Sequence, residues 1–215
     1  MNFKELAEQY KGELLNNVLP FWLENSQDKE FGGYFSCLDQ TGKVFDTDKF
    51  IWLQGREVWM FAMLYNKVEK RQEWLDCAIQ GGEFLKKYGH DGDYNWYFSV
   101  TQEGEPLVEP YNIFSYTFAT MAFGQLGLAT GNKEYEQIAK ITFEKILLKV
   151  DLSRRFHSSA FIAKSSFWGW NSTTQFCFAL LFHGHTCWQM SHPTTRLESL
   201  FVSASGISSL VSMVR

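Results

Sequence analysis

The stretch 51-IWLQGREVWM-60 carries most of the fold prediction, because its pattern is helical although a charged residue stands among its indole rings. At about 100° per residue, Trp52, Arg56 and Trp59 share one face of such a helix. A face of this kind is ordinarily an apolar stripe that packs into a core. The permanent charge of Arg56 therefore indicates either a residue facing a polar cavity or a structural ion pair, with Glu57 or Asp48 as the acid.

The sequence on both sides of this stretch is mainly helical. Two short segments with strand character interrupt it, residues 31–46 and 94–109, in which Gly42 and Gly104 are suited to hairpin turns. Apolar periodicity predicts five helices, at residues 3–25, 49–68, 72–88, 111–129 and 133–149.

The two strand-like segments belong to a repeat. Tyr34-Phe35-Ser36 recurs as Tyr97-Phe98-Ser99, and each hairpin is followed by two helices, with a step of about 62 residues. A helix pair of this kind cannot bury its apolar face alone, so the repeat predicts an all-α, stacked or closed α/α architecture. Two units and one leading helix are too few to close a ring, which makes residues 1–150 a portion of such a barrel.

Composition changes at about residue 151. Only Asp151 and Glu198 of the 24 acidic residues lie from there onward, whereas serine and histidine become frequent. Residues 151–215 are thus predicted to be an atypical tail without regular periodicity, and our hypothesis is a shifted reading frame, disorder or an unrelated fused end. The alternative is a genuine second segment of unusual composition.

Composition also narrows the class of partner. A net charge of −4, a pI near 5.8 and the lack of a Lys/Arg cluster argue against nucleic acid or an anionic membrane surface, and favour a small polar ligand. No apolar run is long enough to span a membrane, and the first residues lack the pattern of a signal peptide. The four cysteines form no CxxC pair, which is typical of reduced thiols in a cytoplasmic protein.

With 32-GGYFSCLDQTGKVFDTDKF-50 before it, 52-WLQGREVWM-60 resembles the N-acylglucosamine 2-epimerase family, also called renin-binding proteins. The resemblance covers residues 10–150, and 82-GEFLKKYG-89 and 114-FSYTFATMAF-123 look like the family's next helices. Glu57, where glutamine is common, and Tyr116-Thr117 depart from the pattern.

This resemblance implies an (α/α)6 barrel that acts on the open-chain form of a reducing sugar. It implies N-acylglucosamine to N-acylmannosamine epimerisation, with mannose aldose–ketose isomerisation and cellobiose epimerisation as other activities of the family. Because the cellobiose enzymes lack the WLQG run, the monosaccharide branch is favoured. It also implies a homodimer as one option, while the oligomeric state, the sugar and any nucleotide effector stay open.

Chemistry gives Arg56 a role in such a site. Epimerisation at C2 removes a proton alpha to a carbonyl, so the developing oxyanion needs fixed donors or positive charge. The resemblance places Arg56 where members keep an active-site arginine. Trp52 and Trp59 are predicted to stack on the sugar, and Tyr111 and Phe114 to line its pocket, or to be ordinary core aromatics.

The proton carriers are not identified. The resemblance implies paired histidines and a glutamate on later helices, and no histidine of this chain matches them: neither His90, predicted to be a solvated turn residue, nor the four in the tail, His157, His183, His185 and His192. The printed chain is therefore expected to lack epimerase activity, and a non-catalytic sugar-binding fragment is the competing hypothesis.

Other motifs in the sequence have simpler structural explanations. Gly81-Gly82-Glu83-Phe84 spells a cyclase signature, but its helical surroundings favour close helix packing. His183-Gly184-His185-Thr186-Cys187 has zinc-capable side chains without a second cluster. No phosphate-binding glycine loop occurs, so no metal and no cofactor are predicted.

Overall fold

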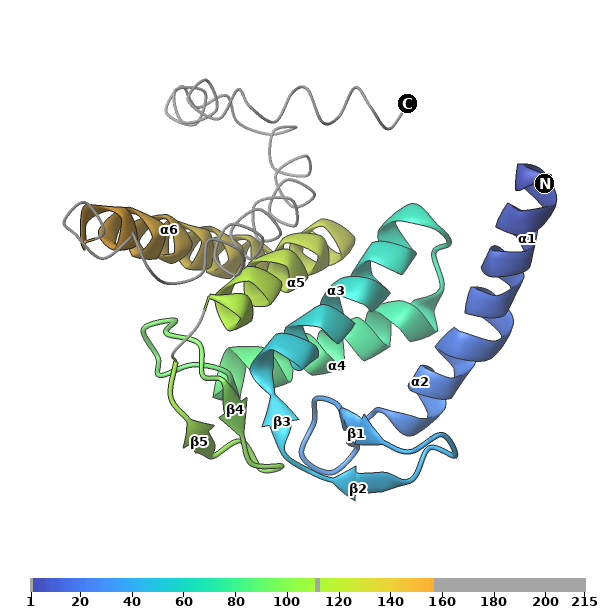
Figure 1. The fold of residues 1–215 in the computed structure, drawn as a ribbon, viewed down its shortest axis with the longest axis horizontal. Coiled ribbons are helices and arrows are strands. Elements are labelled where there is room, and N and C mark those ends of the chain that lie inside the picture. The colour runs from blue at the N-terminus through green and yellow to red at the C-terminus, as the bar shows by residue number, and fades with distance from the viewer. Residues whose placement is uncertain (1, 111–112, 157–215) are drawn as a thin grey trace, which may run out of the picture.

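The structure is a computed structural model that describes residues 2–110 and 113–156 (Figure 1). It begins with a long helical segment in three parts: α1 (Phe3–Glu13), a π-helical turn η1 (Leu14–Val18) and α2 (Leu19–Asn25). The single helix predicted for residues 3–25 is thus continuous but changes its winding. Pro20 explains the change, because it has no amide hydrogen to donate and its ring crowds the carbonyl four residues earlier.

A hairpin and two helices then occur twice, as the repeat predicted. The first unit has β1 (Cys37–Leu38), β2 (Val44–Asp46), α3 (Ile51–Lys67) and α4 (Gln72–Tyr88). The second has β4 (Ser99–Val100), β5 (Pro106–Val108), α5 (Phe114–Thr130) and α6 (Lys133–Phe156). Gly42 and Gly104 take positive φ angles of 87° and 104°, which confirms the turns assigned to them.

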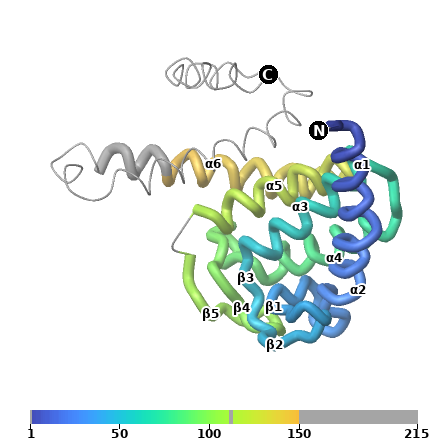
Figure 2. The backbone as a smooth tube through the Cα atoms, turned by 45° about the vertical axis from the view of Figure 1, so that its right-hand side comes forward, coloured from blue at the N-terminus to red at the C-terminus, as the bar shows by residue number. Residues whose placement is uncertain are grey.

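One strand was not predicted. β3 (Lys49–Phe50) lies directly before α3 and pairs antiparallel with β4, with Lys49 opposite Val100 and Phe50 opposite Ser99. This pairing joins the first repeat to the second in a sheet of order β3-β4-β5, beside the separate β1-β2 hairpin. Figure 2 shows all five strands gathered at one end of the helices.

The helices pack as pairs around a shared core. α3 lies against both α4 and α5, and α5 against α6 (Figure 1). Large buried side chains from the two units fill the space between them: Tyr34, Phe61, Trp74, Leu85, Trp96, Tyr116, Phe123 and Leu126. Gly81 lies against the ring of Tyr34, and Gly82 lies against Leu126. The two glycines of Gly81-Gly82-Glu83-Phe84 thus allow close packing of α4, as expected.

The helix predicted for residues 133–149 is longer in the structure. Helix α6 continues through Phe156, so the change in composition at Asp151 does not coincide with a helix end. His157, the other three tail histidines, Cys177, Cys187 and the HGHTC segment lie outside the described residues. Within 2–110 and 113–156, no helix is both long and apolar enough to cross a membrane, and Cys37 and Cys77 are free thiols.

Candidate functional site

Arg56 lies in the second turn of α3, and its side chain is exposed. Trp52 and Trp59, on the same helical face, are half-buried. Arg56 has no hydrogen bond or ion pair to any described residue, so the pairing with Glu57 or Asp48 that the sequence left open is not formed. The guanidinium is therefore free to meet a ligand, but the described residues do not enclose it.

The aromatic residues predicted beside Arg56 occupy different environments. The Trp52 ring lies 6.1 Å from the ring of Phe118, centroid to centroid, so it bridges α3 and α5. Phe114 is half-buried at the first residue of α5, and Tyr111 falls outside the described residues. Phe118 was not singled out from the sequence, since nothing local marks a helix residue as the partner of an indole 66 positions away.

The glutamine of the WLQGR motif, Gln54, anchors α3 to the segment before β1. Its side chain is fully buried; Nε2 donates to the Tyr34 carbonyl at 2.7 Å, and Oε1 accepts from the Tyr34 amide at 2.8 Å. The amide thus pairs with the backbone of the segment before β1 as a neighbouring strand would, which fixes α3 against the first hairpin.

The glycine of the same motif, Gly55, lies where α3 and α5 approach each other closely. A β-carbon on Gly55 would lie 3.0 Å from the backbone carbonyl carbon of Phe118, so a larger residue would require α3 and α5 to move apart by a few tenths of an ångström. The motif therefore combines one residue that anchors the helix, one that brings the neighbouring helix close, and Arg56, which is left exposed.

Glu57 points to the other side of α3. Glu57 as a residue is half-buried, but its carboxyl oxygen lies 2.5 Å from the hydroxyl oxygen of the fully buried Ser26, and burial of the carboxyl group raises the pKa of Glu57 to about 8. A group that prefers its neutral form cannot neutralise Arg56, which agrees with the absence of a pair between them.

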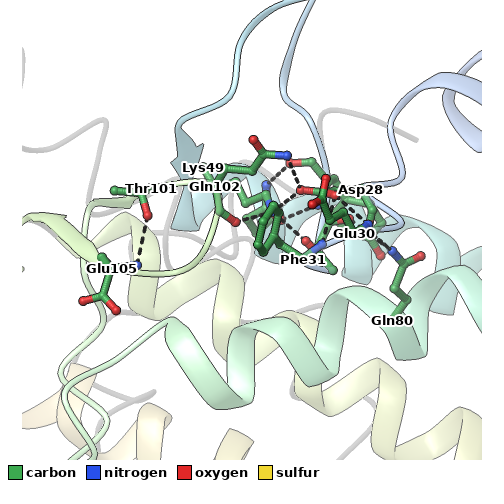
Figure 3. Close-up of polar contacts among 12 residues, drawn as sticks. Asp28, Glu30, Phe31, Lys49, Gln80, Thr101, Gln102 and Glu105 are labelled. Carbon is green, nitrogen blue, oxygen red and sulfur yellow. Dashed lines mark hydrogen bonds and ion pairs between the residues drawn. The ribbon is translucent and has the colours of Figure 1, made fainter.

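A buried ion pair holds the loops at the start of α3 (Figure 3). Lys49 Nζ donates to Asp28 Oδ2 at 2.8 Å, to the Gly32 carbonyl at 2.6 Å and to the Gln102 carbonyl at 2.7 Å. Lys49 is 0% exposed and Asp28 1%. Burial lowers the pKa of Lys49; for Asp28, burial opposes ionisation, but the hydrogen bonds from Lys49 and its other donors hold the pKa below its ordinary value.

Gln102 also donates to Asp28 Oδ2, at 3.0 Å, and Gln80 of α4 donates to the Asp28 carbonyl, at 2.8 Å. The network thus connects β3, the β4–β5 hairpin, the 28–32 loop and α4, with every donor of Lys49 used. Its function is to position the elements around α3 rather than to react.

His90 was predicted to be a solvated turn residue, and this was wrong. It is half-buried, with ring centroids 4.6 Å from Tyr94 and 4.9 Å from Trp96, and burial lowers its pKa. Its Nδ1 accepts from the Gly92 amide at 3.0 Å. His90 is the one histidine among the described residues, and it packs within the 89–96 loop.

An open groove of about 630 Å³ lies elsewhere, between the loop at residues 30–32 and α4. No residue of α3 or α5 lines it, so it is separate from the Arg56 face; its lining comprises Glu30, Phe31, Gly32, Gln80, Glu83, Phe84, Lys86, Lys87 and Tyr88. Over the described ranges, no group of three His, Cys, Asp or Glu side chains is placed to hold a metal ion.

Paired helices in tandem, joined at one end by hairpins, define the class: part of an α/α barrel. The sequence profile of the N-acylglucosamine 2-epimerase family matches residues 33–173. The chain belongs to this family.

Relatives agree in sequence and in fold. The chain is 41% identical to the N-acylglucosamine 2-epimerase of Rattus norvegicus, over 66% of this chain and 35% of that protein. It is 27% identical to the cellobiose 2-epimerase of Bacteroides fragilis, over 66% of this chain and 36% of that protein. The solved cellobiose 2-epimerase of Bacillus thermoamylovorans superposes with a TM-score of 0.61 at 26% identity, over 66% of this chain and 36% of that one.

These matches identify the architecture as part of an (α/α)6 barrel, as predicted. The chain spans about a third of the length of the relatives that it matches.

Proposed function

We propose that this chain supplies the Arg56-bearing portion of a sugar 2-epimerase site, of the type that interconverts N-acylglucosamine and N-acylmannosamine. The reaction removes the C2 proton of the open-chain sugar and returns it to the other face. In the intermediate, negative charge accumulates on the C1 oxygen, and Arg56 binds that oxygen through its planar donors.

The observation that carries the proposal is the free guanidinium of Arg56. It is exposed on the face of α3 that also holds Trp52 and Trp59, and no described acid neutralises it. Indole faces suit the C–H faces of a sugar, while an unpaired arginine suits a developing anion. The higher identity to the rat N-acylglucosamine enzyme than to the cellobiose enzyme supports an N-acylated monosaccharide as substrate.

The 215 residues alone are proposed to be inactive. The one described histidine, His90, packs on Tyr94 and Trp96, and burial lowers its pKa. No described histidine thus accompanies Arg56 as a proton carrier. Deuterium incorporation at C2 of N-acetylmannosamine, incubated with the purified chain in D2O, would show this part of the proposal to be wrong.

A pair of ligands tests the role of Arg56. The aldonic acid of N-acetylmannosamine carries a carboxylate where the intermediate carries its oxyanion, whereas the corresponding alditol is neutral there. Because a hydrogen bond to a charged group contributes about 1.5–3 kcal/mol, Arg56→Ala is expected to weaken aldonate binding by about 10- to 100-fold and to leave alditol binding nearly unchanged.

Isothermal titration calorimetry measures both affinities. Lys67→Ala is the matched control, because Lys67 is an exposed cation near the end of the same helix. An equal loss of aldonate affinity in both variants would mean that general charge, rather than Arg56, attracts the ligand. Aldonate binding that persists in Arg56→Ala would refute the assignment.

A further inference from the structure

Where α2 meets α3, three oxygen-bearing groups lie within hydrogen-bond distance: the Ser26 hydroxyl, the Glu57 carboxyl and the Trp22 carbonyl. Their arrangement indicates whether Glu57 is protonated. Ser26, next to the end of α2, places its hydroxyl oxygen 2.5 Å from Glu57 Oε1 and 2.6 Å from the Trp22 carbonyl oxygen. Ser26 is 0% exposed, so no solvent reaches the hydroxyl to take part.

Only one proton belongs to that hydroxyl. The Trp22 carbonyl can only accept, and two oxygens 2.6 Å apart with no proton between them repel each other. The Ser26 proton is therefore directed to Trp22, in the usual bond from serine to the carbonyl four residues earlier. A hydrogen bond between the Ser26 hydroxyl oxygen and Glu57 Oε1 then needs a second proton. Only the Glu57 carboxyl group can supply it, by being protonated.

No charge around Glu57 favours its ionised form. The titratable groups that face it are Tyr34, from the segment before β1, and Cys77, from α4. Burial raises the pKa of both, so both are neutral, and the Tyr34 hydroxyl donates to the Cys77 carbonyl at 2.7 Å. The neighbouring Arg56 is exposed on another face of the helix, and no described cation pairs with Glu57.

We propose that Glu57 is a neutral carboxylic acid in the folded protein at neutral pH, and that it donates to Ser26 as a positioning residue between α2 and α3. Ionisation of Glu57 removes the proton that it donates to Ser26. The resulting negative charge lies 2.5 Å from the Ser26 hydroxyl oxygen, whose own proton is directed to Trp22, and the contact between α2 and α3 is weakened. Since the Ser26 carbonyl also accepts from the Phe35 amide, at 2.6 Å, the contact extends to the first hairpin. This inference concerns the helix that carries Arg56 and holds whatever ligand that helix serves.

The direction of the pH dependence follows from linkage. Burial raises the pKa of Glu57 from 4.5 to about 8, so between these two values the folded chain binds a proton that the unfolded chain has released. The contribution of Glu57 to stability is complete below about pH 4.5 and falls as pH rises toward about 8. Above that value it changes no further, because both states are ionised.

Replacing Glu57 by glutamine separates the pH dependence that Glu57 contributes to stability from that of all other groups. Glu57→Gln keeps the shape and a donor but cannot ionise, whereas Glu24→Gln changes an exposed carboxylate on α2. Urea unfolding of the 215-residue chain and both variants, followed by tryptophan fluorescence from pH 5 to 9, gives three stability curves. The folding equilibrium constant of the parent chain is expected to fall relative to that of Glu57→Gln by up to about tenfold per pH unit, and to level off near pH 8.

Glu24→Gln is expected to run parallel to the parent chain across the whole range. A constant ratio between the parent chain and Glu57→Gln, or a parent chain that gains relative stability as pH rises, would overturn the proposal. So would failure of Glu57→Gln to fold, because an amide should replace a neutral acid.

A second measurement observes the proton directly. Infrared spectra of the folded chain at pH 7 should contain a protonated-carboxyl band that is lost in Glu57→Gln and kept in Glu24→Gln. If the parent chain and Glu57→Gln gave identical spectra in the protonated-carboxyl region, a neutral Glu57 would be contradicted.

Discussion

At the scale of single residues, the position of the exposed Arg56 depends on neighbours that are themselves buried. Gln54 ties α3 to the Tyr34 backbone, and Lys49 ties the loops before α3 to one another. A guanidinium is useful to catalysis only where its position is fixed before the oxyanion forms. The residues before Arg56 therefore determine where it lies, although the chemistry that we propose belongs to the arginine.

The buried ion pair gives the first prediction at this scale. Lys49→Ala should destabilise the chain by about 3–5 kcal/mol, because it leaves the Asp28 carboxylate buried without its counter-charge. Lys133→Ala, which removes an exposed pair with Glu136, should cost about 0–1 kcal/mol. Urea unfolding measures both, and similar losses for the two variants would contradict the role given to Lys49.

Some of these residues could be predicted and others could not. Trp52, Arg56 and Trp59 were placed on one face because helical spacing alone decides it. The partners of Lys49 and Glu57 were missed because Asp28 and Ser26 are brought to them by the fold and not by spacing. The expected solvation of His90 was wrong because Tyr94 and Trp96 return to cover it.

At the scale of elements, the repeat of a hairpin and two helices was readable because each part has a local signal. Periodicity gave α4 its observed bounds, and positive-φ glycines marked the turns. The β3–β4 pairing was not readable, since two residues of strand carry too little pattern and the partner lies in the other repeat. The π turn η1 was also missed, although Pro20 was a signal for it.

The contact between α3 and α5 leads to a prediction at this scale. Gly55→Ala should destabilise the chain by about 1–3 kcal/mol, because the new methyl group meets the Phe118 backbone, which cannot rotate away. Gly124→Ala, in α5, meets nothing within 4 Å and should be neutral or stabilising by up to about 1 kcal/mol.

Thermal unfolding followed by circular dichroism compares the two glycine variants. Equal shifts in Tm for Gly55→Ala and Gly124→Ala would mean that helix propensity, and not the approach of α5, determines the cost at residue 55.

At the scale of the whole molecule, the chain belongs to a family of ring-shaped helical enzymes and covers about a third of the length of the relatives compared. The described part contains two hairpin repeats and one leading helix, with the Arg56 face formed by α3 beside α5. Our hypotheses about residues 157–215, including their histidines, lie outside what the structure describes. The structure thus describes the Arg56 face, which we propose binds the oxyanion, and its one described histidine, His90, lies away from that face in the 89–96 loop.

The most direct test of the central claim is a titration of the 15N-labelled chain with the aldonic acid of N-acetylmannosamine, followed through arginine Nε–Hε NMR signals. Arg56→Lys identifies the Arg56 signal, and Arg71, which already pairs with Glu69, serves as the internal reference. We expect the Arg56 signal to shift and saturate while the Arg71 signal stays in place. An Arg56 signal that does not move, or that moves no more than the Arg71 signal, would contradict the claim that this arginine binds the oxyanion.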